Sequence, residues 1–199
     1  MWWEIDILGF DEQFFSILSV ITFSIALIGM LLLRPLMIRE SVARITVVLT
    51  LIYFVFNLPN IALFYGLHNW TSEISNGIID ARFIAIADAT LEAPFGQIAI
   101  IPILAWIARY APKHLKATYF AVLASLINLS HAASSLLTKY LNRVFEIRRE
   151  MRDLQTEAIL ILQDYSELGI LLILVAAIGL TLPLAVIAAV QHSPLRTKQ

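Results

Sequence analysis

The chain has no cysteine and little charge of either sign. Only 15% of its 199 residues are Asp, Glu, Lys or Arg, and the formal net charge is −1. Without cysteine there can be no disulfide bond, no thiol catalysis and no cysteine-ligated metal. A chain without excess positive charge also lacks the basic surface that binds nucleic acid, so no nucleic-acid partner is expected.

Short catalytic motifs are missing as well. The sequence holds no Gly-rich phosphate loop, no HExxH pair and no nucleophile elbow. These absences indicate a protein that is not an enzyme and that needs neither a metal nor another cofactor.

What the chain has in abundance is apolar residues. Hydrophobic residues make up 59% of it, with a mean hydropathy of +0.80, whereas a soluble domain is usually about 45–50% apolar. This composition predicts an integral membrane protein in the lipid bilayer. Because open strand edges cannot be satisfied in lipid, we expect an all-α polytopic helical bundle.

Five apolar runs are long enough to cross a bilayer, which takes about 17–25 residues. Together they predict a single transmembrane domain over residues 1–199, with one long polar loop at 141–167 on the outer side. The predicted spans are 13–33, 45–66, 78–108, 115–140 and 168–190.

Basic residues in the short loops predict the orientation. They gather between the first and second spans, between the third and fourth, and after the fifth, so all three regions lie on one side. By the positive-inside rule the N-terminus is outside and the C-terminus is cytoplasmic, in the inner or plasma membrane of the cell. The residues are Arg34, Arg39, Arg44, Arg109, Lys113, Lys116, Arg196 and Lys198.

The polar loop at 141–167 predicts a short amphipathic helix on the outer surface, because its apolar residues recur at helical spacing. Such a helix could serve as a gate or a partner contact. The interpretation we favour is a solvated connector with pairs such as Arg149 and Asp153 one helical turn apart. The apolar residues are Leu154, Ala158, Ile161 and Leu162.

Two carboxylates inside the third span are the most informative residues of the chain. Asp88 and Glu92 lie one helical turn apart in the apolar run 78–108. Each costs about 2.5–3.5 kcal/mol on insertion, so intramembrane acids are retained mostly for function. Pro94 follows them and frees a backbone carbonyl, as in the broken helices of transporters.

The acid pair supports three interpretations. Two carboxylates close together in low dielectric do not both ionise cheaply, so one is expected to hold a proton and to couple transport to protons. Alternatively, the pair faces a cationic or hydrogen-bond-donating part of a substrate. The third interpretation is a structural hydrogen-bond network. Arg82, near the outer end, could pair with Asp80 or with a neighbouring helix.

Polar residues also follow one face of the second span, where Tyr53, Asn57 and Asn60 lie beside Pro59. This face could hydrogen-bond a substrate or hold helices together. In the first span, by contrast, a stripe of small residues predicts close helix packing. The stripe consists of Ser16, Ser19, Thr22, Ala26 and Gly29.

The fourth span carries a polar stripe that includes Asn128 and His131. Counted from the cytoplasmic end, Asn128 overlaps the depth of Asp88, so we expect the third and fourth spans to face each other around one polar cavity. His131 could shuttle protons or donate to a ligand there. It could equally be a packing residue.

Several segments resemble a known family, the folate–biopterin transporter branch of the major facilitator superfamily. They are Leu8–Phe15 (LGFDEQFF), Asp88–Gln97 (DATLEAPFGQ), Lys116–Ala121 (KATYFA), Ala124–Asn128 (ASLIN), Thr138–Asn142 (TKYLN) and Asp164–Gly169 (DYSELG). The resemblance implies that the five spans correspond to helices eight to twelve in the C-terminal half of a twelve-helix transporter, and that the third span lines the central cavity.

By this resemblance the chain would be part of a secondary transporter for a small organic solute, pterin- or folate-like and proton-coupled. The first seven helices of such a transporter are not in this sequence. A missing N-terminal half or a partner membrane subunit is therefore implied, because alternating access needs both halves. The alternative is a non-transporting membrane subunit, or an assembly or scaffold protein that reuses a transporter-like bundle.

Overall fold

The computed structural model describes residues 2–39, 41–98, 101–152 and 159–193 of the chain. Among these residues, four helices are long and apolar enough to cross a membrane: one over Glu12–Leu32, and those over Val42–Phe64, Lys116–Val144 and Leu168–Gln191. The prediction of an all-α membrane bundle is confirmed. The elements in order are α1 (Trp2–Asp6), α2 (Glu12–Arg39), α3 (Val42–Phe64), α4 (Leu67–Ile74), α5 (Ala81–Ile98), α6 (Ile101–Tyr110), α7 (Lys116–Val144), β1 (Met151–Arg152), β2 (Ile159–Ile161) and α8 (Leu168–Gln191).

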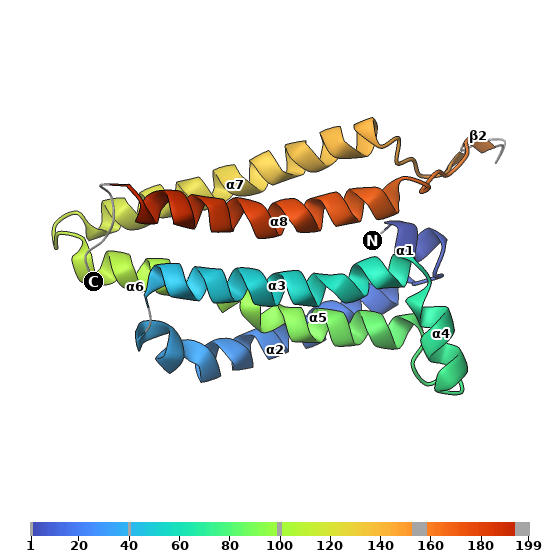
Figure 1. The fold of residues 1–199 in the computed structure, drawn as a ribbon, viewed down its shortest axis with the longest axis horizontal. Coiled ribbons are helices and arrows are strands. Elements are labelled where there is room, and N and C mark those ends of the chain that lie inside the picture. Colours follow the sequence, from blue (N-terminus) through green and yellow to red (C-terminus); the bar gives the residue numbers. More distant parts are fainter. Residues whose placement is uncertain (1, 40, 99–100, 153–158, 194–199) are drawn as a thin grey trace.

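Helix α3 lies at the centre of the packing. It contacts α5 on one side and α8 on another, while α2 packs along α5 (Figure 1). Helix α7 packs chiefly against α6. Figure 1 shows α1, α4 and β2 at one end of the molecule, and α6 and the end of α8 at the opposite end. The segments that the sequence places on the outer side thus share one end, which we call the α1 end.

The predicted run 78–108 corresponds to two helices in the structure. Helix α5 carries Asp88, Glu92 and Pro94, and α6 carries the rest of the run. Residues 99–100, between them, lie outside the described part of the chain.

The small residues of α2 allow α5 to approach closely. Ala26 is buried, and a Cβ added to Gly29 would lie 2.5 Å from Cβ of Pro94. The hydroxyls of Ser16, Ser19 and Thr22 bond instead to carbonyls four residues back in their own helix. The predicted close packing is therefore confirmed at Gly29, where α2 meets α5.

The loop at 141–167 differs from its prediction. Residues 159–161 form β2, antiparallel to β1, where an amphipathic helix was expected. Backbone groups of Arg148 and Asp164 bond each other in both directions and bring the two arms together, and β-branched Ile159 and Ile161 suit an extended chain. The expected helix is thus wrong at Ile161; Asp153, Leu154 and Ala158 lie outside the described residues.

Most of the apolar surface of these helices is exposed. Phe23 is 70% exposed and Leu32 is 71% exposed, and among the described residues no polar or charged residue is fully buried. In water such contiguous apolar surface would be strongly unfavourable. The protein is therefore an integral membrane protein whose helices face lipid or further membrane segments.

Candidate functional site

Asp88 lines a small cavity near the α1 end of the bundle. The cavity has a volume of about 90 Å³ and lies between α1, α2, α3 and α5. Oδ1 of Asp88 is buried and has no hydrogen-bond partner in the described part of the chain. The other residues of this acidic cavity are Glu4, Phe10, Phe15, Leu18, Asn60, Leu63, Ile84, Ala85 and Ala89.

Glu4 was not predicted to belong to this site. Helix α1 lies against the bundle, held by Trp3, whose ring is buried 5.2 Å from that of Phe64. Glu4 thereby reaches the cavity of Asp88, and the two carboxylates repel each other. A signal was available in retrospect, since Trp3 next to Glu4 gives this segment an apolar side that can dock.

Glu92 lies next to the polar face of the second span. The Tyr53 hydroxyl lies beside the Glu92 carboxylate, and Asn60, two turns further along α3, lines the acidic cavity. Asn57 lies between them in sequence, half-buried, and does not line that cavity. The acid pair therefore faces α3 at both of its members.

Arg82 binds a neighbouring segment and not Asp80. Its guanidinium lies 4.0 Å from Asp11 Oδ2, donates to the Gly9 carbonyl at 3.5 Å, and stands 5.7 Å from the centre of the Phe14 ring. Asp80 instead accepts the backbone N–H of Phe83 at 2.8 Å and so caps α5. Arg82 thus links the start of α5 to the start of α2.

Asn128 and His131 lie apart from the acid pair. Both are exposed on α7, which packs chiefly against α6 and does not share the acidic cavity. The expected facing arrangement of the third and fourth spans is therefore not what the structure shows. Helix α3, which also carries polar residues, contacts α5 and contributes Asn60 and Leu63 to the acidic cavity.

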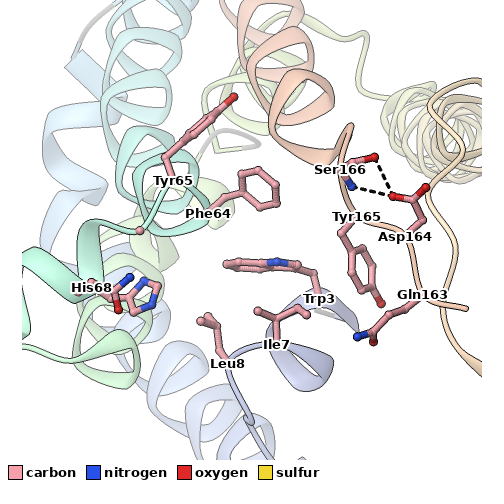
Figure 2. Close-up of a pocket in the computed structure, with 12 residues that line it drawn as sticks. Trp3, Ile7, Leu8, Phe64, Tyr65, His68, Gln163, Asp164, Tyr165 and Ser166 are labelled. Carbon is pink, nitrogen blue, oxygen red and sulfur yellow. Dashed lines mark hydrogen bonds between the residues drawn. The ribbon is translucent and has the colours of Figure 1, made fainter.

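A larger cavity of about 720 Å³ opens at the α1 end of the molecule. Figure 2 shows the Trp3 ring in the middle of it, with His68 on one side, Tyr165 on the other, and Phe64 and Tyr65 beyond. We call it the outer cavity. Its lining comes from α1, from the junction of α3 and α4, and from residues 163–166 before α8.

Two carboxylates fix the segment next to the outer cavity. The Tyr165 hydroxyl donates to Asp6 Oδ2 at 2.6 Å; partial burial and this hydrogen bond raise the pKa of the Tyr165 phenol to about 12. Asp164 Oδ1 accepts both the N–H and the hydroxyl of Ser166, which lower the pKa of Asp164. Arg149 adds a contact of 3.4 Å to Asp6.

In the part of the chain that the structure describes, no three His, Asp or Glu side chains are grouped so as to hold a metal ion. The acidic cavity offers carboxylates beside an amide and aromatic rings. Such groups bind protons, cations or hydrogen-bond donors.

Comparisons with known proteins agree with the resemblance at the level of the family. The sequence model of the BT1 family matches residues 2–195. A folate-biopterin transporter of Synechocystis sp. is 39% identical over 67 residues, which cover 32% of this chain and only 14% of that longer relative. No solved structure matches the chain. Because the family match covers nearly the whole sequence, the chain belongs to the BT1 family.

Proposed function

We propose that the chain is part of a secondary transporter for a small organic solute, with Asp88 and Glu92 as the residues that bind the solute or the coupling proton. The observation that carries this proposal is the buried oxygen of Asp88, which has no partner among the described residues and faces a cavity inside a membrane bundle. Membership of the BT1 family, and a relative whose name is folate-biopterin transporter, support the same function.

The acidic cavity suits a hydrogen-bond donor. An unpaired buried carboxylate oxygen loses its hydration without compensation. Binding a proton or a donor group of a solute therefore lowers its free energy. Glu4 and Asn60 stand beside Asp88, and Phe10 and Phe15 supply aromatic walls. A pterin- or folate-like solute, which carries ring N–H and amino groups on a flat apolar ring, has the chemistry that these side chains recognise.

The proposed transporter needs more protein than this chain. Helix α7 is exposed along its length and carries Asn128 and His131 on its surface. Polar side chains facing lipid are unfavourable, whereas across a helix–helix contact they hydrogen-bond. We propose that a further membrane part, an N-terminal half or a partner subunit, packs against α7, and that the bundle corresponds to the C-terminal half of a major facilitator fold. The α1 end would then face outward and the C-terminus the cytoplasm.

Uptake into proteoliposomes tests the proposal. The protein is purified in mild detergent together with whatever co-purifies, reconstituted, and supplied with radiolabelled biopterin under an imposed proton gradient. Saturable uptake that rises with the gradient is expected. A stable complex with an unrelated assembly and no flux of biopterin would contradict transport and favour the non-transporting subunit.

A further inference from the structure

The outer cavity is separate from the acidic cavity, although helix α1 borders both. Trp3 and Ile7 of α1 line the outer cavity, while Glu4, on another side of the same short helix, lines the acidic one. The outer cavity, at about 720 Å³, falls within the range of about 300–1,000 Å³ that is usual for small-molecule sites. It is therefore large enough to hold a small organic solute.

Aromatic rings form the walls of the outer cavity. The ring centres of Phe64 and Tyr65 lie 5.4 Å apart at 89°, and those of Trp3 and Phe64 lie 5.2 Å apart at 51°. Figure 2 shows Trp3, Phe64, Tyr65 and Tyr165 around one space, from three separate segments of the chain. Trp3 is buried, whereas Tyr65 is 60% exposed and leaves much of its ring uncovered. Rings at these spacings offer faces and edges on which a flat ring packs.

Amide and imidazole groups stand among these rings. The side-chain amides of Asn69 and Gln163 make no hydrogen bond within the described residues, so each offers a donor and an acceptor. One ring nitrogen of His68, Nδ1, lies 3.3 Å from the Leu63 carbonyl, which orients the imidazole. Among the described residues, no Lys or Arg lines the cavity, and the one carboxylate there, Asp164, is occupied at Oδ1 by Ser166.

We propose that the outer cavity is a separate binding site for an uncharged, planar heteroaromatic solute at the α1 end. The flat ring would pack on Tyr65 and Trp3, and its heteroatom edge would bond the amides of Asn69 and Gln163. Aromatic residues at the ends of membrane helices also serve as interfacial anchors. Here, however, Trp3 packs directly on Phe64 at the wall of the cavity, and the free amides give that space polar partners an anchor does not need.

The choice of biopterin as the probe rests on the proposed function, but the site itself does not. Binding of biopterin to the purified protein in mild detergent is measured by equilibrium dialysis, with sucrose as a non-aromatic comparison. Two variants address the site: Tyr65→Ala removes a wall, and Asn69→Ala removes a polar group from an exposed side chain that packs little. Trp70→Ala is the matched control, since Trp70 is 62% exposed on α4 and does not line the cavity.

Saturable binding of biopterin and not of sucrose is expected, weakened about threefold to tenfold by Tyr65→Ala and by Asn69→Ala, and unchanged by Trp70→Ala. Binding that survives both cavity variants but is lost in Asp88→Asn would overturn the proposal, because the solute would then bind only at the acidic cavity. An absence of saturable binding would overturn it too, whereas binding without uptake would contradict only the proposed function.

Discussion

The hydroxyl of Tyr165 donates a 2.6 Å hydrogen bond to Asp6, which joins the segment before α8 to the short helix at the other end of the sequence. Arg149, from the loop before β1, contacts the same carboxylate at 3.4 Å and lies 5.8 Å from the ring of Trp2. Together these contacts hold α1 against the bundle. Because Glu4 and Trp3 belong to that helix, the link at Asp6 supports both cavities at the α1 end.

The link predicts a dependence of stability on high pH. The pKa of the folded Tyr165 phenol is raised from 10.0 to about 12, so its contribution to stability is complete below about pH 10 and is lost as the pH rises from there through about 12. The thermal unfolding temperature in detergent should therefore fall more steeply between about pH 10 and 12 for the original protein than for Tyr165→Phe. Phenylalanine has no hydroxyl at this position that can ionise. Parallel curves for the two proteins would show that the hydrogen bond does not support the fold.

Removal of the acceptor tests the same link from the other side. In Asp6→Asn the amide oxygen still accepts a hydrogen bond, but it carries no negative charge. Ionisation of the Tyr165 phenol is then no longer disfavoured by repulsion from a carboxylate. The pKa of Tyr165 is expected to move from about 12 toward the ordinary value of 10.0, measured by ultraviolet titration of the phenol. Glu73→Gln, on α4, is the control and should leave the titration unchanged. An unaltered titration in Asp6→Asn would refute this pairing.

The contact of α2 with α5 predicts a strong size limit at Gly29. A Cβ there would lie 2.5 Å from Cβ and 3.0 Å from Cγ of Pro94, which has a rigid ring, so Gly29→Ala should destabilise the bundle by about 1–3 kcal/mol. Gly179, on α8, is the matched control, since a Cβ there has no atom of the described residues within 4 Å. Gly179→Ala should be neutral or slightly stabilising, because alanine favours a helix. The two variants are compared by their thermal unfolding temperatures in detergent. Equal changes for Gly29→Ala and Gly179→Ala would contradict the close packing of α2 on α5.

The exposed polar stripe of α7 predicts a different response. Replacing Asn128 or His131 with leucine should change the thermal stability of the purified chain by no more than about 0.5 kcal/mol, because neither residue packs within the described bundle. Association with the proposed membrane partner should weaken, as measured by co-purification in mild detergent. Leu129→Ala, on the neighbouring exposed surface, is the comparison. Strong destabilisation of the chain alone would show that these side chains support its own fold.

The helices were predictable from sequence because length and apolarity alone decide whether a run crosses a bilayer. Close packing at Gly29 was predicted from side-chain size, since only small residues allow such an approach, but Pro94 was not predicted as its partner. The polar face of the second span, with Tyr53 and Asn60, was predicted. The helix that packs against this face was not predicted. These features could be predicted from the local spacing of residues along each helix. Only the structure shows which helix faces pack against each other.

The remaining errors concern contacts between distant segments. Glu4 lies at the cavity of Asp88 only because α1 folds back onto the bundle. No pattern in either segment of the sequence predicts that the two segments meet. Asn128 was expected at the depth of Asp88 from a count of residues, but depth does not give the rotation or the neighbour of a helix. In the polar loop, helical spacing of a few apolar residues was outweighed at Ile161 by backbone pairing of Arg148 with Asp164.

Uptake by the Asp88→Asn variant tests the central proposal most directly. Asn keeps the shape of the side chain but can neither hold the proton nor carry the charge, so biopterin uptake is expected to fall by about tenfold or more, with normal membrane insertion. Asp80→Asn is the matched control, because Asp80 caps the same helix outside the acidic cavity and asparagine caps equally well. Loss of uptake in Asp88→Asn but not in Asp80→Asn is the predicted result. Equal, undiminished uptake by both variants would contradict the assignment of Asp88 to solute or proton binding.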